Sequence, residues 1–398
     1  MHFIANRATL ANLTKRAVRS YWKEVTEGVV KIQGFTMIRA IHRPMSTGKI
    51  EVWSQNANRI LRIFTMEADV HMPGETSIPL SMGELLAEWR SELVEVSFDP
   101  RRPSKLKCFP HPSESKSISL ELPEKRDTPI RPTPISSITL TLPDFGDQLD
   151  EMVSHTAKSA VNNLAWESVH LVNWNQRPAL LSTDGIRLAL IPIGDPDKRG
   201  PDRTISFPRE LIAAFEQNGS TPQIEFLMAE GSCALIDGGT EVWSPRAEVE
   251  LFDWRDPVKS WIDDKIESSV QVRRADIEAL LHRALIVANK QHEVGISWGN
   301  SELTVWSSTI DEGSFIGTAP GESIGDLARG SISGRMLRDA VKLVADNPDD
   351  VITIQRTSMN RGPYIVKACA EGKDEASTRF VFIGRIGDTN GPEKPKFD

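Results

Sequence analysis

The chain carries the octapeptide Leu-Ser-Thr-Asp-Gly-Ile-Arg-Leu at residues 181–188, between two short apolar runs at residues 178–181 and 189–191. Apolar runs joined by a polar Asp-Gly step are typical of two antiparallel strands that meet at a tight turn. The octapeptide therefore predicts a β-hairpin whose bend lies at Asp184 and Gly185.

The tip of this hairpin carries more than turn residues. It combines one hydroxyl, two aliphatic side chains and one guanidinium, on Thr183, Ile186, Leu188 and Arg187. An apolar peptide could bind to such a surface. Alternatively, the aliphatic residues could simply belong to the core, because every antiparallel sheet needs turns and buries many of the residues beside them.

Length and charge limit what the chain can be. It has 398 residues, of which 39% are hydrophobic, and this length exceeds what one core usually holds. The formal net charge of −8 argues against a generally basic nucleic-acid-binding protein and leaves only a local basic surface. We therefore expect two or three domains with a mostly acidic exterior.

The three cysteines, Cys108, Cys233 and Cys369, are far apart and odd in number. They indicate neither a disulfide framework nor a zinc site, so no metal and no cofactor are predicted and a reducing compartment is expected. No stretch approaches about eighteen consecutive apolar residues, and no signal peptide is recognisable. The sequence thus predicts a cytoplasmic protein without a membrane segment.

A strand followed by an amphipathic helix occurs three times, with the strands at Phe3, Ile138 and Val272. The spacings are 135 and 134 residues, and 126 residues follow the last strand. Such a period indicates one module copied three times. We predict domains at residues 1–134, 135–266 and 267–398, with linkers at 129–134 and 256–268 and a disordered tail at 387–398.

Each predicted domain has a second helix at a similar place, near residues 84–89, 210–215 and 336–341. Short alternating strands with turn signals fill the remaining sequence. The pattern predicts an α+β fold in which two helices per domain pack on antiparallel sheets.

The segment Thr-Asp-Gly-x-Arg-Leu-Ala, here residues 183–189, resembles a segment of the middle domain of the bacterial DNA sliding clamp, the beta subunit of DNA polymerase III. The middle third of the chain is the most similar, the last third less so, and the first third resembles the family by layout. The resemblance implies a DNA clamp fold, in which three repeated clamp domains assemble head-to-tail with those of a second chain into a ring.

The resemblance also implies a function. A clamp homodimer would encircle double-stranded DNA without sequence specificity and tether the replicative DNA polymerase, clamp-loader subunits and other proteins through short peptide motifs. It would be a processivity factor in DNA replication and not an enzyme. The pocket for partner peptides would be formed by Leu164, Thr183, Gly185, Ile186, Arg187, Leu188, Pro257, Pro363, Val381 and Ile383.

If the helices line the opening of the ring, as the resemblance implies, helix periodicity indicates which of their residues would face DNA. In the first helix Leu10, Leu13 and Ala17 form an apolar stripe, with Lys15 and Arg16 opposite. The predicted DNA-facing residues are Lys15, Arg16, Arg19, Lys158, Arg283, Lys290, Arg335, Arg338 and Lys342. For the dimer interface, the resemblance pairs Ile118 and Leu120 with Ile286 and Val287.

Two departures from the family keep other functions open. Phe252 is followed directly by Asp253, where the family usually has an intervening proline, and the chain continues beyond its last predicted strand. One alternative is a divergent clamp-like peptide-binding module, of plasmid or phage type, that serves another polymerase or lacks ring closure. Another is a hydrolase with an unrecognised site, although the sequence shows no phosphate-binding loop and no nucleophile elbow.

Overall fold

The computed structural model describes residues 1–385 except for fourteen short gaps. The gaps are residues 26–34, 45–46, 57–58, 80, 113–116, 124–127, 143–144, 159–163, 195–196, 216–222, 246–250, 310, 359–361 and 369–376. Cys369 and the predicted tail at 387–398 lie outside the described residues.

One order of strands and helices occurs three times along the chain, with the short strand β21 added in the third repeat. The first repeat comprises β1 (His2–Asn6), α1 (Arg7–Val25), β2 (Phe35–Ile41), β3 (Gly48–Gln55), β4 (Leu61–Met72), β5 (Gly74–Ser77), α2 (Met82–Ala87), β6 (Leu93–Phe98), β7 (Lys105–His111) and β8 (Ile118–Glu121). The second comprises β9 (Pro134–Thr141), α3 (Phe145–Val153), the 3₁₀ turn η1 (Leu164–Glu167), β10 (Ser168–Trp174), β11 (Arg177–Thr183), β12 (Arg187–Pro192), β13 (Ile205–Pro208), α4 (Arg209–Ala214), β14 (Gln223–Ala229), β15 (Ser232–Asp237) and β16 (Thr240–Pro245). After α5 (Arg255–Asp263), the third comprises β17 (Ile266–Arg273), α6 (Arg274–Ile286), β18 (Glu293–Gly299), β19 (Glu302–Thr309), β20 (Gly313–Pro320), β21 (Glu322–Gly325), β22 (Ala328–Ser333), α7 (Gly334–Val344), β23 (Val351–Thr357), β24 (Tyr364–Ala368) and β25 (Arg379–Ile383).

Strand pairing repeats with the elements. In each repeat the first strand joins the last three, as β1-β6-β7-β8, β9-β14-β15-β16 and β17-β23-β24-β25. The other strands pair in the orders β5-β2-β3-β4, β13-β10-β11-β12 and β22-β18-β19-β20. These pairings are all antiparallel, and helices pack on the sheets, so the predicted α+β class is confirmed.

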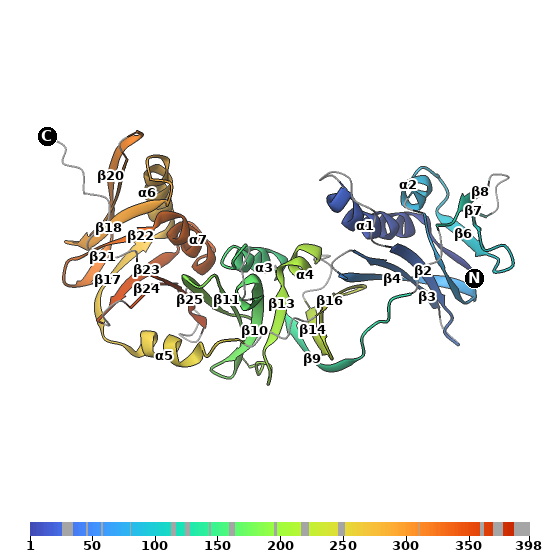
Figure 1. Cartoon of the computed structure of the whole chain (residues 1–398), viewed down its shortest axis with the longest axis horizontal. Coiled ribbons are helices and arrows are strands. Elements are labelled where there is room, and N and C mark those ends of the chain that lie inside the picture. Colours follow the sequence, from blue (N-terminus) through green and yellow to red (C-terminus); the bar gives the residue numbers. More distant parts are fainter. Residues whose placement is uncertain are drawn as a thin grey trace. The chain divides into compact units, whose positions relative to one another are not determined.

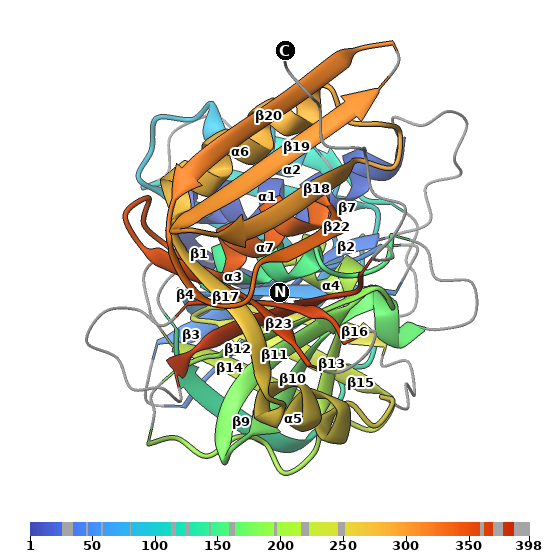
Figure 2. The same cartoon turned by 90° about the vertical axis from the view of Figure 1, so that its left-hand side faces the viewer.

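The chain divides by its contacts into two compact units, Met1–Pro143 with Glu210–Arg246, and Asp144–Arg209 with Ala247–Asp398. Each unit contains one junction where sheets of neighbouring repeats become continuous. In the first unit β4 pairs with β16, and in the second β12 pairs with β25. The division passes through the second repeat because each of its two sheets continues into a different neighbour. Figures 1 and 2 show these strands in the colours of the sequence.

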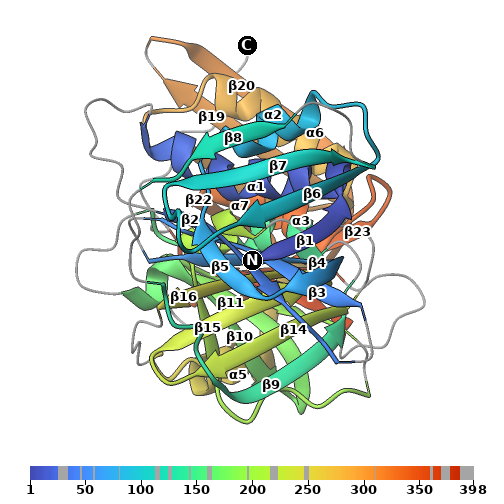
Figure 3. The ribbon, with the colours of Figure 1, turned by 90° about the vertical axis from the view of Figure 1, so that its right-hand side faces the viewer.

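The first unit has an apolar core between α1, α2 and the strands of the first repeat. Phe3, Leu10, Phe64 and Val94 belong to this core and are almost fully buried. Figure 3 shows β8, β7, β6, β1 and β4 side by side, in the order in which they are hydrogen-bonded. In β1 the alternate residues Phe3 and Ala5 are buried, and this alternation fixes which face of the strand belongs to the core.

In the second unit, α6 and α7 lie beside each other and pack on strands of the third repeat. The apolar residues of α7 recur at the spacing of one helix face, and Leu337, Ala340, Val341 and Val344 are buried. The Ser333 hydroxyl accepts a hydrogen bond from the Met336 backbone N–H, which caps the first turn. The segment that the sequence marks as the second linker, residues 256–268, contains helix α5 up to Asp263 and the start of β17 from Ile266.

Among the described residues, none of the helices combines the length and hydrophobicity needed to cross a lipid bilayer.

Two buried carboxylates lie beside the β4–β16 junction of the first unit. Glu51 on β3 and Glu241 on β16 each accept a hydrogen bond from an indole two residues further on, at 3.0 Å from Trp53 and 3.1 Å from Trp243. Arg131, which lies in the predicted first linker, forms an ion pair with Glu241 and is 3.7 Å from Glu51. The linker is therefore held against the junction by charge.

Replacing Arg131 should weaken the first unit. The Glu241 carboxylate would remain buried without its cation, whereas Glu51 would keep Lys49 at 2.6 Å. We expect Arg131→Ala to lower the free energy of unfolding by about 2–3 kcal/mol, measured by urea denaturation. Arg131→Lys should lower the free energy of unfolding by less, because lysine keeps a positive charge. The control Arg199→Ala removes a well-exposed ion pair and should change stability by less than about 0.5 kcal/mol. An Arg131→Ala variant as stable as the control would show that the pair does not hold the linker.

Candidate functional site

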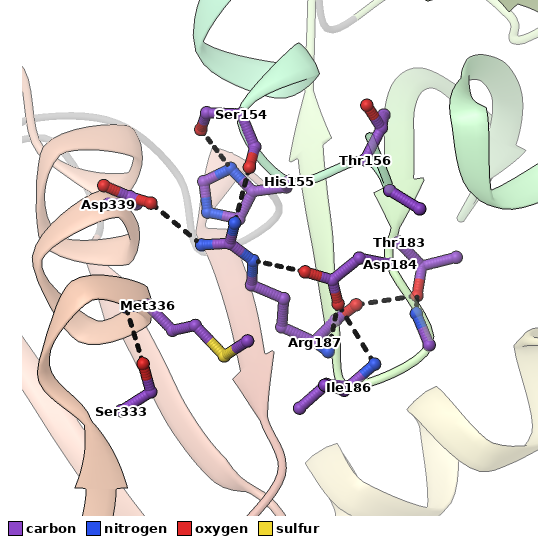
Figure 4. Close-up of polar contacts among 12 residues, drawn as sticks. Ser154, His155, Thr156, Thr183, Asp184, Ile186, Arg187, Ser333, Met336 and Asp339 are labelled. Atoms are coloured by element: carbon purple, nitrogen blue, oxygen red, sulfur yellow. Dashed lines mark hydrogen bonds and ion pairs between the residues drawn. The ribbon is translucent and has the colours of Figure 1, made fainter. Parts of the chain in front are cut away.

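The hairpin predicted at residues 181–188 is present as β11, a three-residue bend and β12. Asp184 accepts hydrogen bonds through one carboxylate oxygen from the backbone N–H groups of Ile186 and Arg187, each at 3.0 Å. The Thr183 hydroxyl accepts one from the Gly185 N–H at 3.1 Å and donates one to the Arg187 carbonyl at 2.6 Å. These local bonds fix the bend, as Figure 4 shows.

Gly185 is required at this bend for two reasons. Its φ is +86°, which disfavours side chains, and a Cβ placed there would lie 3.0 Å from the Trp166 ring. The indole of Trp166 can therefore lie directly over the glycine.

Arg187 ties the hairpin to two helical segments. Its Nε donates to Asp184 at 3.0 Å, Nη1 donates to Asp339 on α7 at 3.1 Å, and Nη2 donates to the Ser154 carbonyl just after α3 (Figure 4). Only 8% of the side chain is exposed. Since two carboxylates and a carbonyl already satisfy the guanidinium, Arg187 positions the hairpin tip.

A neutral histidine lies next to this network. Burial, and to a lesser extent the positive charge of Arg187, lowers the pKa of His155 to about 3, against a smaller opposing effect of its hydrogen bond to the Glu151 carbonyl. His170 is also fully buried, between the Ser206 hydroxyl and the Ala165 carbonyl, and burial lowers its pKa to about 4. Both imidazoles are therefore uncharged at neutral pH.

A pocket of about 390 Å³ opens beside the hairpin tip, within the second unit. Four aromatic side chains, three aliphatic ones, two glycines, one hydroxyl and the satisfied guanidinium line it. The lining residues are Trp166, Phe252, Trp261, Phe382, Ile186, Leu188, Pro363, Gly185, Gly384, Thr183 and Arg187. A mostly apolar concave surface with few polar groups suits a hydrophobic anchor.

The β12–β25 junction forms one wall of this pocket. Leu188 and Phe382 are a cross-strand pair, and the Trp261 ring lies 5.3 Å from the Phe382 ring. The backbone N–H of Gly384 donates to the Ile186 carbonyl at 2.9 Å, which joins the end of β25 to the hairpin tip. Ile186 and Phe252 remain 59% and 42% exposed, so they are accessible to a ligand.

The structure brings together six of the ten residues predicted for this pocket: Thr183, Gly185, Ile186, Arg187, Leu188 and Pro363. Val381 and Ile383 do not line it. They alternate with Phe382 on β25 and are fully buried. Pro257 lies in α5 outside the lining, and Leu164 begins η1, with a side chain outside the described part.

Sequence reasoning missed the aromatic walls, Trp166, Phe252, Trp261 and Phe382. Strand alternation could have shown that Phe380 and Phe382 share one face of β25. It could not have shown that this face meets Leu188, because that contact depends on pairing between strands of different repeats.

One basic residue predicted to face DNA is buried, and this prediction was wrong. Arg16 is 9% exposed, and its guanidinium lies 4.8 Å from the centre of the Phe64 ring. A cation on an aromatic face explains why a charged residue is found on the inner side of α1. Lys15 is half-buried beside Gly83 of α2, and the side chain of Arg19 lies outside the described part.

The other predicted cations are accessible to differing degrees. Arg338 is half-buried and lies 4.0 Å from Asp339. The exposed ones are Lys158, Arg283, Lys290, Arg335 and Lys342.

The residues predicted for the dimer contact also differ in exposure. Leu120 is 8% exposed and packs in the core of the first repeat, with Ile118 against the same core. The side chain of Leu120 therefore cannot reach a second chain. Ile286 is 65% exposed at the end of α6, and Val287 is half-buried.

No protein-family model matches the chain, and no curated protein is significantly similar to it in sequence. Solved structures do match. The DNA polymerase III subunit beta from Pseudomonas aeruginosa has a TM-score of 0.77 at 14% identity over 96% of this chain and 99% of that chain. The subunit beta from Borrelia burgdorferi, in complex with a natural product, has 0.74 at 12% over 97% and 99%. A Pseudomonas aeruginosa DnaN sliding clamp bound to griselimycin has 0.73 at 12% over 96% and 99%.

The chain is therefore similar over nearly its whole length to proteins with the DNA clamp fold. The solved structures named above are beta subunits or sliding clamps of bacterial DNA polymerase III, and the fold predicted from the resemblance is confirmed.

The two neutral histidines predict a loss of stability on acidification. Their folded-state pKa values lie below the ordinary value of 6.5, so below pH 6.5 the unfolded chain binds protons that the folded chain does not. Stability is complete above pH 6.5 and should fall by about 1.4 kcal/mol per pH unit for each histidine as the pH decreases toward the folded-state values.

Urea denaturation between pH 7 and pH 5 measures this loss. His155→Leu should remove one histidine's share of the slope. A slope that is the same in His155→Leu and in the wild type would mean that His155 is protonated in the folded state.

Proposed function

We propose that this protein is a DNA sliding clamp, which encircles duplex DNA and tethers a DNA polymerase through short peptides bound in the pocket beside the hairpin tip. One observation carries the proposal: a mostly apolar pocket lies at the β11–β12 bend of a chain with the clamp fold over almost its entire length. The role is non-catalytic and cytoplasmic, and clamp-loader subunits and other replication proteins would use the same pocket.

The pocket favours an aliphatic or aromatic anchor. Trp166, Trp261 and Phe382 provide apolar walls, and Arg187, the only charged residue among the described ones that line the pocket, is already paired. Burial of one large apolar side chain in such a site supplies much of the affinity of a short peptide.

Ile186 offers the cleanest test of the pocket, because it lines the pocket while remaining largely exposed. Ile186→Glu should lower the affinity for a fluorescein-labelled peptide containing Gln, Leu and Phe by about 30-fold, measured by fluorescence anisotropy. This change corresponds to about 2 kcal/mol of binding free energy. Ile266→Glu alters another exposed isoleucine, outside the lining, and should bind normally. Equal affinities for the two variants would refute the pocket assignment.

We further propose the predicted division into three domains, at residues 1–134, 135–266 and 267–398, and a head-to-tail homodimer. Within the chain, β4 pairs with β16 and β12 pairs with β25. In both junctions the first partner is the third strand after the first helix of its repeat, and the second partner is the last strand of the following repeat. The same rule leaves β20 and β8, both at sheet edges, for a second copy.

Pairing of β20 in one protomer with β8 in its partner would continue the sheet by backbone hydrogen bonds. The buried Leu120 would then contribute through its backbone. Because α6 packs on β20, the exposed Ile286 at the end of α6 is close enough to the same interface to be covered by it.

A closed ring makes a topological prediction. The protein should have a mass in solution near twice 44.3 kDa, stay on nicked circular DNA, and be released when that DNA is linearised, because a ring slides off free ends. Size-exclusion chromatography with light scattering and gel filtration of loaded DNA measure these outcomes, with a clamp loader supplied to open the ring. Retention that does not change after linearisation would favour surface binding and the divergent module that lacks ring closure.

A further inference from the structure

The aliphatic residues contribute little accessible surface to the pocket beside the hairpin tip. Leu188 is only 5% exposed, and Pro363 is buried. Among the described lining residues, Ile186 is the exposed aliphatic one, and it lies at the tip of the hairpin. Most of the aliphatic lining is therefore already covered by the protein itself.

The accessible walls of the same pocket are aromatic. Trp166 and Trp261 are half-buried, and Phe252 is 42% exposed. These residues and the rest of the described lining all belong to the second unit. A side chain that enters the pocket thus meets two indoles and one benzene ring.

The rings come from different segments of the second unit. Trp166, in η1, lies over Gly185, where an added Cβ would be 3.0 Å from the indole. Trp261 belongs to α5, and its ring lies 5.3 Å from that of Phe382 on β25, with 43° between the two planes. Phe252 precedes α5 by three residues. Both indoles are therefore packed before a ligand binds, which lowers the entropic cost of binding.

The pair of Trp261 and Phe382 has a geometry that a ligand could extend. Aromatic rings attract one another at centroid distances of about 4.5–7 Å in tilted or offset arrangements, because the positive edge of one ring meets the negative face of another. A ligand ring in the pocket would gain this attraction in addition to burial. An aliphatic side chain of the same size would gain burial alone.

A cationic ligand is less suited to the pocket, although aromatic faces also attract cations. The described lining residues include no carboxylate, and the one charged group among them is the guanidinium of Arg187. The carboxylates of Asp184 and Asp339 are already engaged by this guanidinium. A lysine or arginine of a peptide would therefore lose its hydration without gaining a counter-ion.

We propose that the pocket selects an aromatic side chain of the partner peptide as its anchor and discriminates against aliphatic side chains of equal size. Trp166, Trp261 and Phe252 are the residues that determine this specificity. The inference deepens the proposed function, because it rests on the binding of partner peptides in this pocket. It assigns the partners to the class of proteins that present an accessible phenylalanine or tryptophan.

Pairs of peptides that differ only in aromaticity test the proposal on the full-length protein. In the labelled peptide used above, the Leu and Phe positions are both replaced, either by phenylalanine or by cyclohexylalanine. Cyclohexylalanine is similar in size and more hydrophobic, but it has no π-face. We expect the phenylalanine peptide to bind about tenfold more tightly in fluorescence anisotropy. A third peptide with lysine at both positions should bind more weakly than either.

Variants of the pocket locate this selectivity. Trp261→Leu keeps an apolar wall but removes a ring, so the ratio of the two affinities should fall from about tenfold to about threefold. Phe252→Leu alters a more exposed ring and should also lower the ratio. The matched control Trp89→Leu changes a half-buried tryptophan of the first unit and should leave the ratio unchanged. A general loss of affinity would affect both peptides and cancel in the ratio.

The outcomes separate this proposal from the proposed function. Equal affinities for the phenylalanine and cyclohexylalanine peptides, both lowered by Ile186→Glu, would overturn the aromatic selectivity and leave the pocket as a peptide site. Tightest binding of the lysine peptide would overturn it in favour of a cation site. A ratio that neither Trp261→Leu nor Phe252→Leu changes would refute the assignment of these residues. If none of the peptides binds, the peptide pocket and the selectivity are both refuted.

Discussion

The pocket depends on backbone hydrogen bonds between β12 and β25. These strands belong to different repeats and are almost two hundred residues apart in the sequence, yet their pairing places Phe382 directly opposite Leu188. Because the register of an antiparallel pair fixes which side chains share a face, a slip by one residue would replace Phe382 in the pocket by Val381 or Ile383. The contact between the two strands thus determines the chemistry of the site.

Arg187 makes this arrangement rigid. A buried guanidinium needs several acceptors, and the three that it finds belong to the hairpin bend, the end of α3 and α7. Each acceptor compensates part of the desolvation of the charge, so the hairpin tip, α3 and α7 are stabilised together. The same charge contributes to keeping His155 neutral. A residue that looks like a ligand-binding cation in the sequence therefore acts as a positioning residue for an apolar pocket.

Repetition of one module gives equivalent sheet edges, of which some are paired within the chain and others are not. Two edges are joined within the chain, at β4–β16 and β12–β25. Others, at β8, β20 and β9, end their sheets among the described residues. The proposal for a homodimer follows from comparing the edges at β8 and β20 with the equivalent edges that are joined within the chain. Three copies in one chain thus serve as internal controls for one another.

The sequence by itself determined the α+β class, the repetition of the module and the hairpin at residues 181–188, because local spacing of apolar residues and the Asp-Gly step are sufficient for these features. It also indicated six residues of the pocket, all but one of them within or next to that hairpin. Only the tertiary structure decided that Arg16 faces an aromatic ring and that Arg187 forms ion pairs with Asp184 and Asp339. It also decided which aromatic side chains form the walls of the pocket, namely Trp166, Phe252, Trp261 and Phe382. These features arise from contacts between segments distant in sequence, and no local pattern specifies which segment will lie opposite another.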